Sequence, residues 1–322
     1  MRNLMLKTLL LLIILLGPAH ADERADKIVG AWSDWVAEAD VLGSTIVVMR
    51  AGEVVAGDAR GVVLNTPLPL AGLSKAVTGA CVIDLVHRGL LPLRATLGDI
   101  LDEQGPLADV TVAQLLTHRS GVWPDSTRGD VELQTARHDQ TEQVSLRALS
   151  RVPQERLVGR FAHNNENYAI LGRVVGAVTG KDHVTACAEA VLAPLGIASA
   201  SLSGKWAGHG AWGGWAMSAP DFARFAWARF GPDGLVGADL AIWPSAPLAG
   251  GIRYGPGVMW RLLEGRHMIW SSGILCWNSD GDGGHFAIYG DEYLVVTLYS
   301  MCQDGTGAFA ALNRALLMAA MR

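Results

Sequence analysis

The sequence predicts an α+β protein: one antiparallel sheet flanked by terminal helices, with an inserted, mostly helical lobe. A strand–turn–strand pattern, STIVVMR, AGE and VVAGDARG, follows the first helical segment. Helical spacing then dominates to about residue 230, and strand patterns return after residue 250 as GVMWRLL, HMIWSS, HFAIYG and YLVVTLY. Strands from both ends most simply form one sheet, and a cleft between the two lobes is the expected place for a site.

Each helix is supported by its own periodicity or terminal signal. Apolar residues at helical spacing predict a first helix within residues 22–40. A second stripe begins at Leu73 and runs to about His87, with Gly89 as a stop. Thr111 and Gln114 form a capping box ahead of a third helix. A further helix has an apolar face that begins at Tyr168, and it ends at Gly180. Ser218 is the predicted N-cap of a helix that contains Phe222 and Phe225. The last helix has Phe309, Leu312 and Leu316 on one face.

The N-terminus has the pattern of a secretory signal peptide. Two positive charges in residues 1–7 precede an apolar run at 9–16, and Ala19 and Ala21 fit the small-residue positions of a cleavage site before Asp22. A membrane span needs about 20 apolar residues, more than this run has. We therefore expect residues 1–21 to be removed, leaving a periplasmic or secreted protein without a stable membrane anchor.

Composition restricts the possible partners and cofactors. The net charge of −5 is mild, and the chain has no basic stripe, so we expect no nucleic-acid partner. His118 and His285 have no partners at metal-ligand spacing, and we expect neither a metal nor a cofactor. The DGDGG run at residues 280–284 has too few ligands for a calcium loop and is predicted to be a turn.

The four cysteines do not form the pattern of a disulfide scaffold. Cys81 and Cys187 fall in apolar helical patterns and are predicted to be buried thiols. Cys276 and Cys302 follow neighbouring strand patterns, so a bridge between them stays open.

Several segments in the same order resemble the serine β-lactamase and D-alanyl-D-alanine peptidase-like superfamily. They are LAGLSKAVTG, VTVAQLLTHRSGV, FAHNNENYAILGRVVGAVTGK, APLGI and MSAPDFARFA. The nearest branch holds class C β-lactamases, D-alanyl-D-alanine carboxypeptidases and related esterases. The resemblance implies a β-lactamase/transpeptidase-like domain over residues 22–322. Its α/β lobe would comprise about 22–72 and 250–322, and its helical lobe about 73–249.

The chemistry of that superfamily requires three motifs. S-x-x-K places a nucleophilic serine one helical turn from a lysine that helps to remove its proton. Y-x-N adds a phenol to the proton relay and an asparagine that binds substrate. A strand bearing Lys or His, a small residue and Gly helps to hold the substrate and the oxyanion.

This sequence departs from all three motifs. Lys75 matches the first, but Gly72 stands where the serine should be. Asn165 matches the second, but His163 replaces the tyrosine. The third motif falls on a predicted strand that has serine in place of Lys or His. Its register is uncertain by about one residue. The residues of this strand that we expect to bind a ligand are Ser271, Ser272 and Gly273.

Two other routes to hydrolysis stay open at this point. Ser74 adjoins Lys75, but neighbouring helical side chains diverge by roughly 100°. Ser74 also lies in an approximate G-x-S-x-G elbow, although prolines precede it where that elbow needs a strand. Alternatively, His163 would activate a water in space left by the missing serine side chain.

The first hypothesis is therefore an exported pseudoenzyme with a binding or regulatory role. Lys75, His163 and Asn165 would be remnants of the catalytic set, with Gly72 at the nucleophile position. Its partner would be a peptidoglycan-derived peptide, a small acyl ligand or another protein. The alternative is an active hydrolase of the family, either an esterase or amidase or a hydrolase of β-lactams or D-Ala peptides, that uses Ser74 or a His163-activated water.

Overall fold

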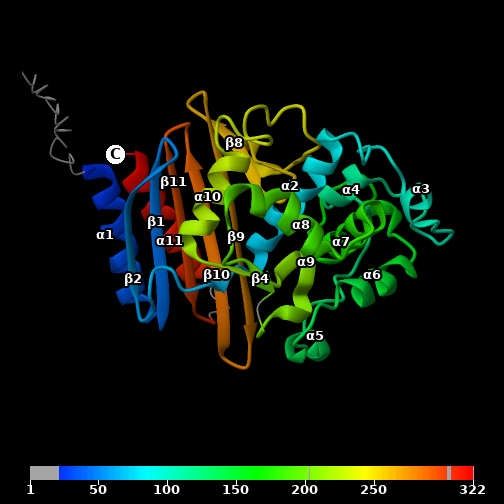
Figure 1. Cartoon of the computed structure of the whole chain (residues 1–322), viewed down its shortest axis with the longest axis horizontal. Helices are drawn as coiled ribbons and strands as arrows, with labels where there is room; N and C mark the ends of the chain where they lie inside the picture. The colour runs from blue at the N-terminus through cyan, green and yellow to red at the C-terminus, as the bar shows by residue number, and fades with distance from the viewer. Residues whose placement is uncertain (1–21, 203, 303–305, 322) are drawn as a thin grey trace, which may run out of the picture.

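The computed structural model describes residues 22–202, 204–302 and 306–321. In Figure 1 the sheet runs through the molecule, with helices α1 (Glu23–Glu38) and α11 (Thr306–Met321) at one side and the helical lobe at the other. The expected fold class is thus confirmed. The predicted signal peptide, residues 1–21, lies outside the described residues.

The main sheet is built from both ends of the chain. Its eight described strands pair antiparallel in the order β2-β1-β11-β10-β9-β8-β7-β6. Their bounds are β1 Gly43–Arg50, β2 Glu53–Arg60, β6 Ala246–Pro247, β7 Arg253–Tyr254, β8 Met259–Leu263, β9 Arg266–Trp277, β10 Asp280–Tyr289 and β11 Tyr293–Ser300.

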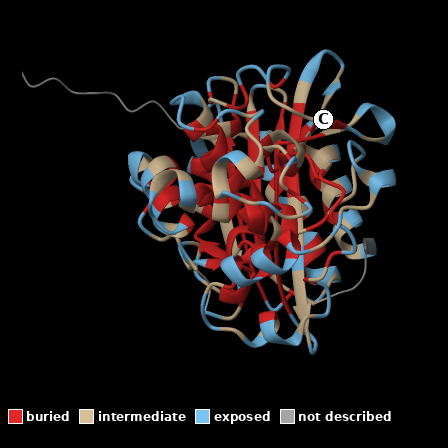
Figure 2. Cartoon of the chain, turned by 90° about the vertical axis from the view of Figure 1, so that its right-hand side faces the viewer, coloured by how far each residue is buried: buried red, intermediate tan, exposed pale blue. Residues whose placement is uncertain are grey.

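Alternation of side chains along these strands divides the core into two parts. One face packs on α1 and α11 through residues such as Trp32 and Leu312. The other face packs on the helical lobe through residues such as Leu73 and Phe286. Figure 2 shows buried residues in red through the interior, with exposed residues in pale blue mostly at the periphery.

The helical lobe contains the predicted capping features. Thr111 and Gln114 form their capping box, Ser218 caps α10, and Gly180 takes the left-handed conformation that ends α7. A small sheet of β3, β5 and β4 lies beside this lobe. The bounds are α2 Ser74–His87, α3 Leu97–Leu101, α4 Val112–Leu116, α5 Val131–Thr135, α6 Thr141–Leu149, α7 Glu166–Thr179, α8 His183–Cys187, α9 Gly210–Gly213, α10 Ala219–Phe230, β3 Leu68–Pro69, β4 Ser201–Leu202 and β5 Trp215–Met217.

The prediction of a turn at residues 280–284 is wrong, because this run forms the first half of strand β10. Its glycines are needed for close packing. A Cβ on Gly281 would come within 2.5 Å of the Cα of Cys302, and one on Gly283 within 2.6 Å of the ring of Tyr299. The carboxylate of Asp282 is buried and accepts a hydrogen bond from Trp206 Nε1 at 2.7 Å.

The prediction of thiols at Cys81 and Cys187 is also wrong. Both residues are buried as expected, but a disulfide joins them across a sequence separation of 106. It connects helix α2 to the end of α8, two elements whose contact their local sequences do not reveal. Cys276 and Cys302, both within the described residues, are not joined by a disulfide.

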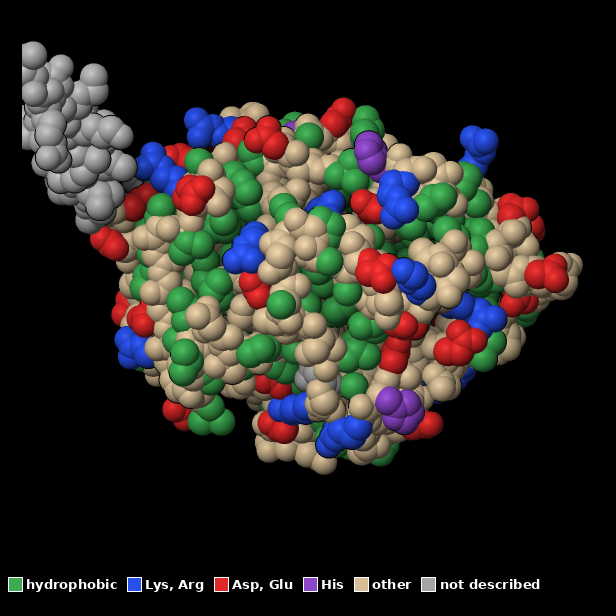
Figure 3. All heavy atoms as spheres, in the orientation of Figure 1, with side chains coloured by type: hydrophobic (Ala, Val, Ile, Leu, Met, Phe, Trp, Pro, Cys, Tyr) green, Lys and Arg blue, Asp and Glu red, His purple; other side chains and the backbone are tan. Residues whose placement is uncertain are grey.

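The surface and the helices add two observations. On the face shown in Figure 3, acidic and basic side chains are interspersed. In the part of the chain that the structure describes, no helix has both the length and the apolar character required to cross a bilayer.

Candidate functional site

A cavity of ≈ 380 Å³ lies where the helical lobe meets strand β9. It collects residues that are far apart in the sequence, as the ordered motifs predict. The predicted site residues that line it are Gly72, Lys75, His163, Asn165, Ser272 and Gly273. Ser271 lies on the same strand, β9, but is buried and is not among the residues that line the cavity.

Gly72 and Gly273 bring two backbone segments into direct contact at the cavity. Gly72 lies in the 3-10 turn η1 (Ala71–Leu73), immediately before α2. A Cβ built on Gly72 would lie 2.9 Å from Gly273 Cα and 3.1 Å from the Ser272 carbonyl oxygen. A Cβ on Gly273 would lie 2.4 Å from Gly72 Cα. Strand β9 therefore occupies space that a side chain at residue 72 would need.

Lys75 is the buried cation of the cavity. Its residue is 7% exposed, and Nζ donates a hydrogen bond to the Trp212 carbonyl at 3.3 Å. Burial lowers the pKa of Lys75 to about 8, opposed by the negative charge of Asp125 and assisted by the positive charge of Arg128. Lys75 is therefore still mostly protonated at neutral pH.

His163 lines the same cavity as Lys75. Burial and the nearby charge of Lys75 lower the pKa of His163 to about 4. The imidazole is consequently neutral at pH 7 and is a weak base. Its ring lies 4.7 Å, centroid to centroid, from that of His118, a fully buried residue whose Nε2 is 3.1 Å from the Tyr254 hydroxyl.

Asn165 is held by a buried carboxylate that the sequence analysis did not identify. The Asn165 backbone N–H donates to Asp125 at 3.1 Å, and the side-chain amide donates to Thr127 Oγ1 at 2.9 Å. The Thr127 hydroxyl in turn donates to Asp125 at 2.7 Å. The Thr127 hydroxyl is thus engaged both as donor and as acceptor, and it is held in place at the cavity wall.

Ser74 does not reach the cavity. It is completely buried, and its hydroxyl oxygen accepts a hydrogen bond from the Trp215 backbone N–H at 3.2 Å. The residue therefore helps to join α2 to β5. This environment does not support Ser74 as a nucleophile.

The hydroxyl of Ser272 is engaged with strand β10 rather than with Lys75. It lies 2.9 Å from Nδ1 of His285, whose ring contacts Phe309 of helix α11. His285 is completely buried, and its Nε2 has no hydrogen-bond partner in the described structure. Among the residues that the structure describes, no carboxylate is hydrogen-bonded to this imidazole in the way that a catalytic triad requires.

Sequence reasoning missed the cavity wall formed by residues 206–215. His209 and Trp212 line the cavity from this Gly- and Trp-rich segment. Its residues fit neither a helical nor a strand period, and the only available signal was the density of glycines, which marks irregular structure. Gln134 and Arg128 also line the cavity and were not identified beforehand. Among the described residues, no group of three or more His, Cys, Asp or Glu side chains is arranged to hold a metal ion.

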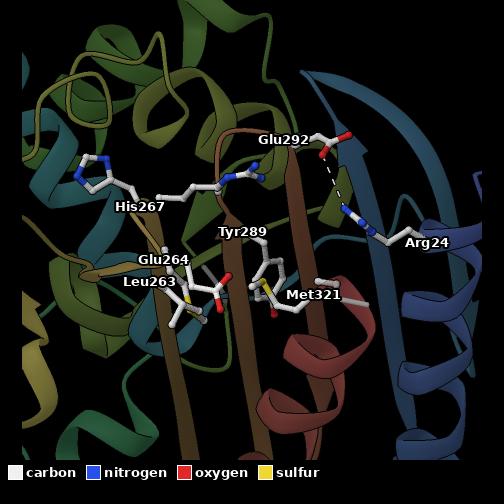
Figure 4. Close-up of a pocket in the computed structure, with 11 residues that line it drawn as sticks. Arg24, Leu263, Glu264, His267, Tyr289, Glu292 and Met321 are labelled. Carbon is white, nitrogen blue, oxygen red and sulfur yellow. Dashed lines mark ion pairs between the residues drawn. The ribbon is translucent and has the colours of Figure 1, made fainter.

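A separate hollow of ≈ 300 Å³ lies at the far end of the sheet, near the ends of α1 and α11 (Figure 4). Its lining includes Arg24, Glu264, His267, Tyr289 and Glu292, and it shares no lining residue with the Lys75 cavity. Arg24 and Glu292 form an ion pair across it at 3.7 Å. Both signs of charge are present here, so the hollow has no evident preference for one ligand charge.

Comparison with known proteins agrees with the observed fold. Penicillin-binding protein 4 of Amycolatopsis lactamdurans is 27% identical over 155 residues, which cover 46% of this chain and only 39% of that protein. The class C beta lactamase of Rhodobacter sphaeroides superposes with a TM-score of 0.74 at 17% identity, covering 92% of this chain and 100% of that one.

Two further solved structures share the fold. SurE, solved with D-Leu, gives a TM-score of 0.73 at 23% identity over 92% of this chain and 75% of its own. The D-amino acid amidase of Ochrobactrum anthropi SV3 gives a TM-score of 0.72 at 18% identity, covering 90% of this chain and 99% of its own. The family described as Beta-lactamase matches residues 30–321. The chain belongs to the Beta-lactamase family.

Proposed function

We propose that this member of the family is a pseudoenzyme that binds a ligand in the Lys75 cavity without forming an acyl-enzyme. The observation that carries the proposal is the contact between Gly72 and Gly273. Residue 72 carries no hydroxyl, and a Cβ there would lie 2.9 Å from Gly273 Cα, so a side chain fits only if the backbone shifts. Acylation needs an activated nucleophile within reach of its base, and Lys75 has no such partner at residue 72.

The other hydroxyls near the cavity support the same conclusion. Ser74 is buried and accepts from Trp215, Thr127 is engaged with Asp125 and Asn165, and Ser272 is paired with His285. None of these hydroxyls is hydrogen-bonded to Lys75 in the described structure. The cavity itself is retained, which favours binding over a purely structural role.

Peptides and small acyl compounds are the ligands that we propose, with a protein partner as the alternative. The similar structures include SurE solved with D-Leu and a D-amino acid amidase, so related folds are known with small amino-acid-like compounds. A cell-wall peptide is one ligand with this chemistry.

Mass spectrometry of the intact protein tests the proposal. The purified protein would be incubated with a β-lactam and, separately, with a fluorophosphonate, beside an active serine hydrolase as positive control. We expect no mass increase in this chain. A stoichiometric adduct would overturn the proposal, and peptide mapping would show whether Ser74, Thr127 or Ser272 carries it.

A water-based mechanism makes a different prediction. His163 lines the cavity together with Lys75, so turnover of a chromogenic β-lactam or an aryl ester without labelling would favour a His163-activated water. Such turnover should disappear in His163→Ala. Absence of turnover in the wild type would leave the binding role as the supported function.

Export is a second part of the proposal. The apolar run at residues 9–16 and the Ala19 and Ala21 pattern support signal cleavage before Asp22. The Cys81–Cys187 disulfide supports an oxidising compartment such as the periplasm or the exterior. N-terminal sequencing of protein from the culture medium or periplasm should begin at Asp22, and a start at Met1 would contradict this.

A further inference from the structure

We infer that the cavity binds the carboxylate of a small organic acid, with Lys75 as its anchor and no covalent step. This inference rests on the proposed non-catalytic function and specifies the ligand of the same site.

The charge of the cavity lining is one-sided. Lys75 and Arg128 line it, and none of the described residues that line it is Asp or Glu. Arg128 lies at the mouth, where its side chain is 70% exposed and its Nε is 3.8 Å from Asp125. Lys75 lies deeper and is nearly inaccessible to solvent. An anion entering this cavity therefore meets positive charge at the mouth and again at the base.

The ammonium of Lys75 has hydrogen-bonding capacity to spare. It carries three N–H donors, and its hydrogen bond in the described structure goes to the Trp212 carbonyl. Asp125 exerts the opposing charge on Lys75, but its carboxylate already accepts hydrogen bonds from Thr127 and Asn165. A ligand carboxylate would supply the missing acceptor, and charge-assisted hydrogen bonds strengthen when water is excluded.

The rest of the wall carries no further charge at neutral pH. Trp212 and His209 line the cavity, but the Nε1 and Nδ1 atoms of their rings are buried away from solvent and so do not offer hydrogen bonds to a ligand. Burial lowers the pKa of His209 to about 4, so its ring is neutral. Ile274 and Leu275 add apolar wall on the strand side. The combination suits a monocarboxylate that carries an apolar or aromatic group.

Isothermal calorimetry with matched probes tests the inference. Benzoate and benzamide have the same shape and differ in charge, so they isolate the contribution of the carboxylate. We expect benzoate to bind the wild type about ten- to a hundred-fold more tightly than benzamide, as one charge-assisted interaction provides. Hippurate is benzoylglycine and so carries an amide as well as a carboxylate. Comparison with benzoate tests whether a ligand that resembles the carboxyl end of a peptide binds more tightly.

Lys75→Met removes the charge and keeps the length of the side chain. The preference for benzoate should vanish in this variant. Lys27→Met is the matched control, because Lys27 is exposed on α1 and its loss changes the net charge equally. Lys27→Met should retain the full preference, and a thermal melt of each variant confirms that it is folded.

The pH dependence of wild-type binding provides a readout that needs no variant. Benzoate affinity should fall as pH rises through about 8, because Lys75 then loses its charge. Benzamide affinity should not change in that range. The charged and titratable groups that face Lys75 are Asp125, Arg128, His118, His163 and His209. The three histidines are already neutral near pH 7, so they do not produce this change.

The outcomes separate the inference from the proposed function. Equal binding of benzoate and benzamide, no binding of either, or a preference that survives Lys75→Met would overturn the carboxylate assignment. The pseudoenzyme proposal would remain in each case. Covalent labelling of the wild type would instead overturn the proposed function, whatever benzoate does.

Discussion

Introducing a serine at residue 72 should destabilise the protein before it provides any new chemistry. In Gly72→Ser the new Cβ would lie 2.9 Å from Gly273 Cα, against an ordinary carbon–carbon contact of about 3.5–4.0 Å. Strand β9 or turn η1 must therefore move by roughly 0.5 Å or more. The obstructing atoms are backbone, which a rotamer change cannot displace.

The expected cost follows from that geometry. Overpacking a well-filled site destabilises a fold by about 1–3 kcal/mol. For domains of moderate size each kcal/mol corresponds to about 2–4 °C in Tm, so we expect Gly72→Ser to melt about 2–12 °C below the wild type. Gly72→Ala should lose nearly as much, because the Cβ rather than the hydroxyl causes the collision.

Thermal unfolding and intact-mass labelling together measure this prediction. Gly30→Ser is the matched control, since a Cβ on Gly30 meets nothing within 4 Å on the exposed side of α1. The control should melt at or slightly above the wild-type temperature. Gly72→Ser should label slowly at most, because the tyrosine and the third-motif Lys or His are still missing. A Gly72→Ser variant with wild-type Tm and rapid acylation would refute the steric argument.

Three further predictions concern stability. Ser74→Ala should leave any labelling unchanged and lower the free energy of unfolding by about 1–3 kcal/mol, because the buried Trp215 N–H loses its acceptor; faster or slower labelling would contradict this. In protein from an oxidising compartment, alkylation under denaturing conditions should modify two cysteines before reduction and four after it. Replacing both Cys81 and Cys187 by serine should lower the free energy of unfolding by about 3–5 kcal/mol. Burial lowers the pKa of His163, His209 and His285 to about 4, so below pH 6.5 the unfolded chain binds protons that the folded chain does not. Tm should therefore fall as the pH is lowered from 6.5 to 4. A Tm that stays constant over this range would contradict the assignment to these three histidines.

Much of the fold could be predicted because its signals are local. Apolar periodicity and caps such as Thr111 and Ser218 depend on a few neighbouring residues, and the structure has them as expected. The ordered motifs also placed Gly72 and Lys75 in one cavity with residues of strand β9.

What could not be predicted depends on contacts between distant segments. The glycines in the run 280–284 predicted a turn. In the structure their missing side chains instead allow strand β10 to pack closely against Cys302 and Tyr299. Side chains alternate along β9, so a pattern with a register uncertain by one residue cannot say whether Ser271 or Ser272 faces a given side. The bridge between Cys81 and Cys187 likewise depends on how α2 meets α8 in the folded lobe.

The Cys81–Cys187 bridge also affects how the protein would respond to proteases. A single cut in the chain between these residues would leave both fragments covalently joined, so the molecule would run as one species on a non-reducing gel and as two after reduction. The enclosed stretch contains the exposed loop residues near Arg128, where proteases cut most readily. It also contains His163 and Asn165, whereas Lys75 precedes it. The bridge would therefore keep both halves of the ligand cavity on one molecule after such a cut.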